Sequence, residues 1–364
     1  MTRDAPMQFV VLGLSITSSW GNGHATTYRA LVRQLAARGH RVLFLERDLP
    51  WYAENRDLPH PPGATTELYA SVTELKQRFA GAIRDADVVM VGSYVPEGIA
   101  VGQWVTDAAT GVTAFYDIDT PVTLARLDSG GTDYIDRALI RRYDLYLSFT
   151  GGPTLTRLEN EFGASMARAL YCSVDPQHYA PDQTGTRWDL GYLGTYSDDR
   201  QPVLAELMLE AARGLREHRF VVAGAQYPET IAWPANVARI THLPPPAHRG
   251  FYTAQRYTLN VTRSDMVRAG WSPSVRLFEA AACGTPIISD YWDGIEEFFE
   301  PDREILIARS SSETRAYLHD LPDDERTAIG ERARRRVLAA HTASHRAAEL
   351  EAFAHEARAC GAGR

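Results

Sequence analysis

The sequence has few cysteines and no long apolar run. Its 364 residues include only three cysteines, which are too few and too scattered for a disulfide framework or a zinc ligand set. No apolar stretch approaches the about 18 residues that a transmembrane helix needs. The N-terminal residues 1–6 are polar and do not resemble a signal peptide. These absences predict a cytoplasmic protein in a reducing compartment, without a transmembrane segment.

The sequence also has no excess of basic residues, which argues against nucleic acid as a partner. The formal net charge is -8 at pH 7, whereas binding to a nucleic-acid backbone depends on clustered lysine and arginine. Hydrophobic residues make up 45% of the chain and charged residues 23%, as is ordinary for a folded enzyme. Because 364 residues exceed one typical domain, we expect two domains with a core each.

Short β-branched runs alternate with helical patterns along the chain. In the first half, the runs that predict buried strands begin at Phe9, Arg41, Asp87, Val112 and Asp144. Helical spacing fills residues 26–38, 72–84 and 96–109. This alternation predicts an α/β fold with a doubly wound parallel sheet.

A proline-bracketed stretch at residues 172–181 interrupts the alternation and is suited to a linker. Strand patterns resume at Asp189, Arg219, Arg256 and Pro286. We therefore expect one Rossmann-like domain over residues 1–175, a second over residues 176–340, and a C-terminal helix (341–364) that packs back on the first domain. Ligands of such sheets bind at the carboxyl ends of the strands, so we expect the site in a cleft between the two sheets.

Residues 270–293 carry the densest set of candidate binding residues. Ser272 suits a helix N-cap and Pro273 the first helical position, so a helix is predicted to begin there, with Ser272, Arg276 and Glu279 on one face. Amides at a helix N-terminus bind phosphate, an arginine one turn later adds a charge-assisted contact, and a carboxylate can accept ribose hydroxyls. The alternative for Glu279 is an exposed carboxylate paired with Arg276.

Two further segments are predicted to reach the same edge of the second sheet. Gly194 and Thr195 lie in a turn after a strand pattern, and Arg200 follows near the next helix start. Such a turn lets a phosphate approach backbone amides, with the cation close by. Arg263 ends another strand and is a candidate phosphate or acceptor contact. The alternative is an ordinary surface arginine.

In the first half, His24 and an Asp-x-Asp pair are the candidates for catalysis. His24 follows the first strand beside Gly23, and a helix N-terminus keeps its imidazole neutral, as a general base requires. The alternative is a capping or packing histidine. Asp117 and Asp119 could ligate a divalent metal. Because they follow a strand of the first half, we interpret them as an acceptor-facing or helix-capping pair, with no metal.

Residues 270–290 resemble the donor-binding signature of GT-B glycosyltransferases, and are most similar to bacterial spore-maturation CgeB-like proteins, which are related to the family 1 and family 4 group. Residues 20–29, 189–196 and 260–266 resemble the same group. The resemblance implies a GT-B fold and the transfer of a hexose-type sugar from a nucleoside diphosphate, with UDP the favoured donor nucleotide, to a small-molecule or glycan acceptor. We expect no cofactor and no obligatory metal, with the acceptor bound on the first domain and the nucleotide-sugar donor on the second.

Residue by residue, the resemblance implies that Glu279 binds the donor ribose and that Arg200 replaces a phosphate-binding lysine. Ser272 stands where a retaining family has a glutamate, so retention or inversion stays open. The expected catalytic residues are His24, Asp117 and Asp119. The expected donor-binding residues are Gly23, Gly194, Thr195, Arg200, Arg263, Ser272, Ser274, Arg276 and Glu279.

Two other functions are compatible with the sequence. A non-hydrolysing sugar-nucleotide epimerase on the same fold would change the sugar without an acceptor. A non-catalytic nucleotide-sugar-binding protein would bind nucleotide and release none.

Overall fold

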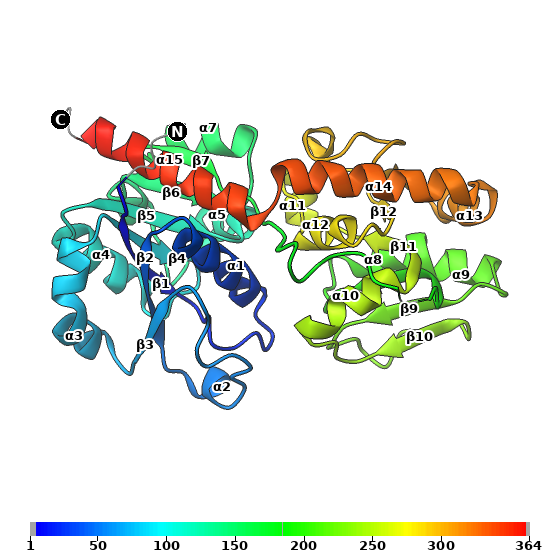
Figure 1. The fold of residues 1–364 in the computed structure, drawn as a ribbon, viewed down its shortest axis with the longest axis horizontal. Helices are drawn as coiled ribbons and strands as arrows, with labels where there is room; N and C mark the ends of the chain where they lie inside the picture. The colour runs from blue at the N-terminus through cyan, green and yellow to red at the C-terminus, as the bar shows by residue number, and fades with distance from the viewer. Residues whose placement is uncertain (1–4, 184, 362–364) are drawn as a thin grey trace. The chain divides into compact units, whose positions relative to one another are not determined.

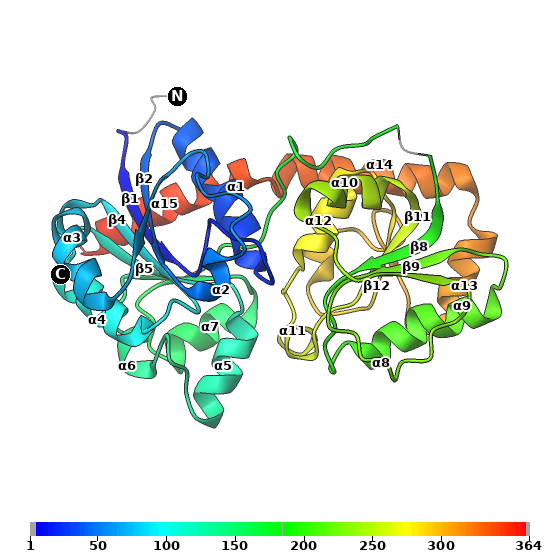
Figure 2. The ribbon, with the colours of Figure 1, turned by 90° about the horizontal axis from the view of Figure 1, so that it is seen from below.

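The computed structural model describes residues 5–183 and 185–361. The chain divides into two compact units: unit 1 comprises Met1–Cys172 and Ala343–Arg364, and unit 2 comprises Ser173–Thr342. Each unit is built on one parallel β-sheet with helices against it (Figures 1 and 2). The predicted α/β fold with two Rossmann-like parallel sheets is confirmed.

The sheet of unit 1 has the strand order β3-β2-β1-β4-β5-β6-β7. Its strands are β1 (Gln8–Gly13), β2 (Arg41–Arg47), β3 (Thr65–Tyr69), β4 (Val88–Gly92), β5 (Val112–Asp117), β6 (Leu145–Ser148) and β7 (Ala167–Ala169). The five predicted runs correspond to β1, β2, β4, β5 and β6. The sequence analysis missed the edge strands β3 and β7.

Helices cover both faces of this sheet. They are α1 (Gly23–Ala37), α2 (Pro50–Ala53), α3 (Val72–Asp85), α4 (Gly98–Ala108), α5 (Thr120–Ser129), α6 (Arg137–Ile140), α7 (Pro153–Asn160) and α15 (Ala343–Gly361). Phe9 and Val11 of β1 pack toward α1 and α15, and Val10 and Leu12 pack toward α3 and α4. Successive residues of a strand face opposite sides, so a sheet buried on both faces needs a continuous apolar run.

The last helix, α15, belongs to unit 1 although it ends the chain. Arg358 Nη2 lies 2.8 Å from Asp87 Oδ1, just before β4. Arg38 Nε, at the end of α1, donates to Glu351 Oε2 at 2.7 Å. Apolar packing and these ion pairs together attach α15 to the sheet.

The sheet of unit 2 has the strand order β10-β9-β8-β11-β12-β13. Its strands are β8 (Trp188–Leu193), β9 (Phe220–Ala223), β10 (Val237–Ile240), β11 (Gln255–Asn260), β12 (Ile287–Ser289) and β13 (Leu306–Ile307). Its helices are α8 (Gln201–Leu204), the π-helix η1 (Ala205–Glu210), α9 (Ala211–Gly214), α10 (Pro245–Thr253), α11 (Ser264–Ala269), α12 (Val275–Ala282), the 3₁₀-helix η2 (Ile295–Glu297), α13 (Ser311–Asp320) and α14 (Asp323–Ala340).

In both sheets the direction in which successive strands are added reverses between two adjacent central strands, β1 and β4 in unit 1 and β8 and β11 in unit 2. In unit 1 the chain builds outward from β1 to β3 and then restarts beside β1 with β4. In unit 2 it builds from β8 to β10 and restarts beside β8 with β11. Ligands of open parallel sheets bind outside the carboxyl ends of the strands at such a switch point. The loops after β1 and β4, and after β8 and β11, are therefore where a site is expected.

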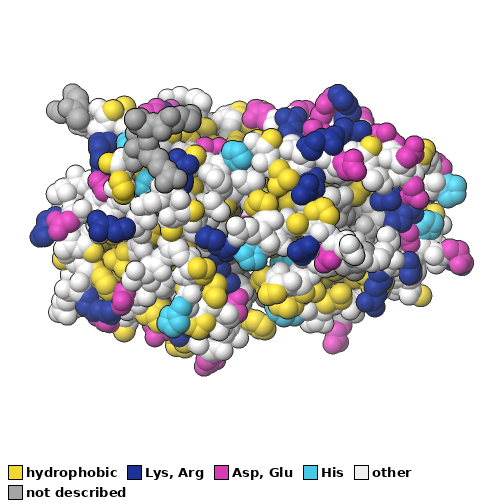
Figure 3. Space-filling view, in the orientation of Figure 1, with side chains coloured by type: hydrophobic (Ala, Val, Ile, Leu, Met, Phe, Trp, Pro, Cys, Tyr) yellow, Lys and Arg dark blue, Asp and Glu magenta, His cyan; other side chains and the backbone are white. Residues whose placement is uncertain are grey.

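Acidic and basic side chains are interspersed on the face that Figure 3 shows. Ion pairs of this kind occur on α14, where Arg326 Nε lies 3.0 Å from Asp323 Oδ1 and Arg332 Nη2 lies 2.6 Å from Glu325 Oε1. Over the described ranges, we find no helix with the length and apolar character that crossing a lipid bilayer requires.

Candidate functional site

Three arginines of unit 2 lie together at its switch point. Arg200 precedes α8, Arg263 follows β11, and Arg276 lies in the first turn of α12. Burial is the largest cause that lowers the pKa of Arg200, and the charges of Arg276 and Arg263 lower it further. Guanidinium groups that repel one another are stabilised when an anion binds between them.

The guanidinium of Arg276 is held by neutral groups. Nε donates to the Leu193 carbonyl at 2.5 Å, and Nη1 donates to Asn260 Oδ1 at 2.7 Å. The guanidinium carbon lies 4.8 Å from the centroid of the Tyr192 ring. None of these three partners is a carboxylate. The buried arginine is thus fixed in position while its charge stays available to a ligand.

Arg200 also has a neutral partner. Its Nη2 donates to the Thr195 carbonyl at 2.7 Å, and its buried Nε has no hydrogen-bond partner among the described residues. Arg263 differs because its Nε lies 3.8 Å from Asp199 Oδ2. Positive charge therefore exceeds negative charge where Arg200 and Arg276 lie.

Besides Asp199, this region has a second carboxylate, Asp290, which accepts hydrogen bonds from the loop after β11. The backbone amide and the hydroxyl of Thr262 donate to it at 3.0 Å and 2.9 Å. Burial raises the pKa of Asp290, and the Thr262 bonds oppose that shift. Asp290 thus holds the loop that carries Arg263.

The turn after β8 lets the backbone come close to Arg276. A Cβ on Gly194 would lie 2.6 Å from the Tyr192 hydroxyl and 3.0 Å from Arg276 Nη2, so a side chain there would displace one of them. Thr195 follows and is exposed. The structure therefore brings the predicted residues Gly194, Thr195, Arg200, Arg263 and Arg276 together in unit 2.

The helix predicted to begin at Ser272 begins later, so that prediction was wrong. α12 starts at Val275, and its N-cap Ser274 is still extended, with φ −81° and ψ 149°. Gly270 and Trp271, before the predicted start, have positive φ angles of 66° and 43°. The Trp271 indole donates to Glu297 Oε1 at 2.6 Å and holds this turn in place. The Ser272 hydroxyl donates to the Gly270 carbonyl at 2.8 Å, and Ser272 does not share a helical face with Arg276 and Glu279.

Ser274 leaves the first amides of α12 without a side-chain cap. Its hydroxyl donates instead to Asn260 Oδ1 at 2.8 Å, the atom that also binds Arg276. The positive end of α12 therefore adds to the charge of the arginines.

Glu279 is buried one helical turn after Arg276. The Tyr252 hydroxyl donates to its Oε2 at 2.9 Å, and His248 Nδ1 lies 3.9 Å from the same oxygen. Glu279 is only 4% exposed, so it is not the exposed carboxylate of the alternative interpretation. The sequence analysis missed Tyr252 and His248, whose spacing on α10 places them on one helical face.

In unit 1, His24 lies at the switch point, in the first turn of α1. Its backbone amide donates to the N-cap Asn22 Oδ1 at 3.0 Å, and Gly23 opens the helix. His24 is buried, and its Nδ1 has no hydrogen-bond partner among the described residues. Burial lowers the pKa of His24, and the Asp119 charge partly opposes this. The imidazole is therefore neutral at pH 7.

Tyr94, in the loop after β4, packs against His24. The two ring centroids lie 5.5 Å apart, and the Tyr94 and Tyr134 centroids lie 4.7 Å apart. Tyr94 has φ 63°, a strained angle for an aromatic residue, and such strain tends to occur at functional sites. Residues from the ends of β1, β4 and β5 thus meet around His24.

The two aspartates of the Asp-x-Asp pair differ in exposure. Asp119 is the N-cap residue of α5 and is half-buried. Asp117 is fully buried: Tyr146 donates to its Oδ2 at 2.6 Å and Thr123 to its Oδ1 at 2.9 Å. The Asp119 amide donates to Asp117 Oδ1 at 3.3 Å, so the buried Asp117 carboxyl is suited to positioning Asp119, and a direct catalytic role of Asp117 stays a prediction.

The buried carboxyl of Asp117 predicts a pH-dependent stability. Burial raises its pKa from 3.8 to about 7, so the folded state binds more protons than the unfolded state between these values. Stability is then full below pH 3.8 and falls as the pH rises through about 7, by on the order of 2–4 kcal/mol. Asp117→Asn removes this dependence. The melting temperature of the variant minus that of the wild type should increase from pH 5 to pH 8, whereas a constant difference contradicts the prediction.

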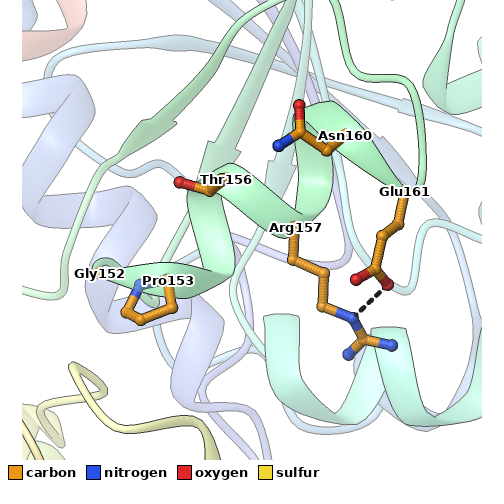
Figure 4. A pocket seen from close by; sticks show the side chains of 6 residues that line it. All are labelled: Gly152, Pro153, Thr156, Arg157, Asn160 and Glu161. Atoms are coloured by element: carbon orange, nitrogen blue, oxygen red, sulfur yellow. Dashed lines mark hydrogen bonds and ion pairs between the residues drawn. The ribbon is translucent and has the colours of Figure 1, made fainter.

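A separate surface pocket of unit 1 lies along α7 (Figure 4) and is lined by Gly152, Pro153, Thr156, Arg157, Asn160 and Glu161. Arg157 Nε donates to Glu161 Oε2 at 2.9 Å, and its Nη2 donates to Asp128 Oδ2 at 2.6 Å. Since two carboxylates already neutralise this cation, the pocket offers little to a charged ligand.

No group of three or more histidines, cysteines or acidic residues that could hold a metal ion occurs in residues 5–183 and 185–361.

Comparison with protein families bears on this site. Residues 200–352 match a family model described as "Glycosyl transferase-like", and the match includes Arg200, Arg263, Arg276 and Glu279. A search of curated protein sequences gives no match.

Solved structures are similar over nearly the whole chain. Sucrose-phosphate synthase from Thermosynechococcus elongatus has a TM-score of 0.71 and 14% identity, over 97% of this chain and 100% of that chain. HepE of Anabaena in complex with UDP-glucose has a TM-score of 0.69 and 12% identity, over 96% and 100%. AviGT4, a glycosyltransferase involved in avilamycin A biosynthesis, has a TM-score of 0.62 and 15% identity, over 97% and 98%. The chain thus has the GT-B glycosyltransferase fold, and most of its unit 2 has a glycosyl transferase-like sequence.

Proposed function

We propose that the protein is a glycosyltransferase that moves a hexose-type sugar from UDP to an acceptor, without an obligatory metal. The observation that carries the proposal is the excess of positive charge at the switch point of unit 2, where Arg200 and Arg276 bind neutral oxygens. A nucleoside diphosphate supplies the anion that such a cluster accommodates.

The parts of the donor have corresponding groups in unit 2. Arg276 and Glu279 lie one turn apart on α12, about 4.5 Å along the helix axis, which suits a diphosphate next to a ribose. Arginines and helix amides stabilise the charge that develops on the leaving diphosphate. UDP and a hexose are favoured because HepE and an α-glucosyltransferase of the same fold were solved with UDP-glucose.

The acceptor is assigned to unit 1. His24 is neutral and buried beside Asp119, so it can take the proton of an acceptor hydroxyl, and the aspartate can stabilise the imidazolium that forms. The predictions of a cytoplasmic location, a bacterial source and a closer relation to CgeB-like proteins are retained as parts of this proposal.

Nucleotide binding and nucleotide release test the proposal. A thermal-shift screen over nucleoside diphosphates and their sugars should give its largest shift with UDP or a UDP-hexose, and release of UDP should depend on an added acceptor. If the sugar of the nucleotide sugar changes in the absence of an acceptor, the protein is an epimerase. If nucleotide sugars bind and no product forms, it is a non-catalytic binding protein. Activity that EDTA abolishes and Mg²⁺ restores would contradict metal independence.

Replacing Glu279 by alanine is expected to weaken UDP binding about 10- to 100-fold, because charge-assisted hydrogen bonds to ribose contribute about 1.5–3 kcal/mol each. Isothermal titration calorimetry measures the affinity, and melting without nucleotide shows that the variant is folded. Unchanged affinity in a folded variant would refute the ribose role.

A further inference from the structure

We infer that Tyr252, Tyr179 and His248 are positioning residues that orient the Glu279 carboxylate and thereby make the site select ribonucleotides over 2′-deoxyribonucleotides. The inference rests on the proposed function, since it concerns the nucleotide part of the donor. These three residues come from two segments, α10 and the stretch that precedes β8, and meet at one buried carboxylate on α12.

The contacts converge on one oxygen of Glu279. Tyr252, which is fully buried, donates to Oε2 at 2.9 Å. His248 Nδ1 lies 3.9 Å from Oε2 and 3.3 Å from the Tyr179 hydroxyl. With Oε2 held in this way, Oε1 keeps acceptor capacity for ribose hydroxyls, because a carboxylate has about four lone-pair sites.

The histidine links this cluster to the loop after β10. His248 Nε2 lies 3.2 Å from the Leu243 carbonyl. A carbonyl can only accept, so Nε2 carries the proton, and in the neutral ring Nδ1 accepts from the Tyr179 hydroxyl. The ring orientation is thus fixed from both sides, and the Tyr179 hydroxyl is held beside Glu279.

Both tyrosines remain protonated donors in this cluster. Burial is the main cause that raises the pKa of Tyr179 and of Tyr252 well above the usual value, and the charge of Glu279 raises both further. A tyrosinate beside a buried carboxylate would be strongly unfavourable. Tyr252 supplies the neutral donor that the buried Glu279 carboxylate needs, and Tyr179, whose proton goes to His248 Nδ1, holds the histidine ring beside that carboxylate.

Burial of the Glu279 carboxylate costs desolvation free energy, and packing alone gives no reason for a charged residue in this position. Glu279 is 4% exposed between Leu277, Phe278 and the alanines of α12, all of them fully buried. An apolar side chain would fill the space without desolvating a charge. The donors around Glu279 therefore serve a ligand, and the hydroxyls that distinguish ribose from deoxyribose are suitable partners.

Binding of UDP and of 2′-deoxy-UDP by calorimetry tests this inference. The double variant Tyr179→Phe/Tyr252→Phe should bind UDP about tenfold more weakly than the wild type. Its affinity for 2′-deoxy-UDP should change less than twofold, so that the preference for the ribonucleotide shrinks. Glu279→Gln should reduce the same preference.

A matched control is Tyr257→Phe. The Tyr257 hydroxyl is also inside unit 2 and donates to the Tyr317 carbonyl at 3.0 Å, away from Glu279. This variant should keep the ratio of the two affinities even if its melting temperature falls.

The outcomes separate the inference from the proposed function. If the double variant binds UDP like the wild type, or loses both nucleotides equally, the positioning role is overturned while the donor site stands. If the wild-type protein binds neither nucleotide, the proposed function fails and the inference fails with it.

Discussion

Replacing His24 by alanine is expected to lower kcat about 10²- to 10⁴-fold, the usual contribution of a general base, with little change in the KM for the donor. The reason is the division of roles: His24 lies in unit 1 beside Tyr94 and Asp119, whereas the proposed donor site is made of residues of unit 2. Initial rates of UDP release at varied donor and acceptor concentrations measure both parameters.

The pH profile distinguishes a base from a packing histidine. Burial lowers the pKa of His24 below 6.5, so kcat/KM should stay level at neutral pH and fall on the acid side, where the imidazole becomes protonated. The charge of Asp119 raises that pKa. Asp119→Asn should therefore move the acid limb to lower pH and also reduce kcat, because the imidazolium formed during transfer loses its counter-charge.

His40 provides the control for a buried histidine of unit 1. Its Nδ1 accepts from the Met7 amide at 3.1 Å, at the amino ends of β1 and β2 and away from the carboxyl edge where His24 lies. His40→Gln should lower the melting temperature and leave kcat unchanged for the folded fraction. If His24→Ala behaves like His40→Gln, His24 packs the helix end and is not a base.

The sequence predicted the central strands well and the edges poorly. Central strands such as β4, with Val88 to Val91 buried, are covered on both faces and read as continuous apolar runs. The missed edge strand β3 has the sequence Thr-Thr-Glu-Leu-Tyr and is mostly half-buried. Polar edge strands give no such signal, because they are paired along one side only and polar residues protect the open edge.

The candidate site was predictable in its residue types and less so in its geometry. Arg276 and Glu279 are one turn apart in any helix through them, so their shared face follows from local spacing. The later helix start was hidden because the segment before α12 is held by residues distant in sequence: Trp271 bonds Glu297, and the N-cap Ser274 bonds Asn260. Tyr179, His248 and Tyr252 were missed for the same reason. The spacing of His248 and Tyr252 on α10 was visible, but the contact of all three residues with Glu279 is set by tertiary packing.

Replacing Arg276 by methionine is expected to weaken UDP binding about 100-fold, because a charge-assisted, bidentate contact to phosphate is lost. Uridine, which has no phosphate, should bind the variant as it binds the wild type. Arg276→Lys should not restore UDP binding, because a lysine ammonium cannot bond Leu193 and Asn260 together and stack on Tyr192.

Comparing the affinities for UDP and uridine shows whether Arg276 acts through its charge on the phosphates or by holding the surrounding loops. Arg256 provides the matched control. Arg256 is a half-buried arginine of β11, outside the group formed by Arg200, Arg263 and Arg276. Its Nη1 lies 3.3 Å from Asp189 Oδ1, and its guanidinium carbon lies 6.0 Å from the centroid of the Tyr257 ring. Arg256→Met should lower the melting temperature and leave the UDP affinity unchanged.

Equal losses of affinity for UDP and uridine in Arg276→Met would mean that Arg276 holds the loops after β8 and β11 in place. Unchanged UDP affinity would place the diphosphate elsewhere and remove the main support for the proposed function. A selective loss of UDP identifies the excess charge at this switch point as the diphosphate site.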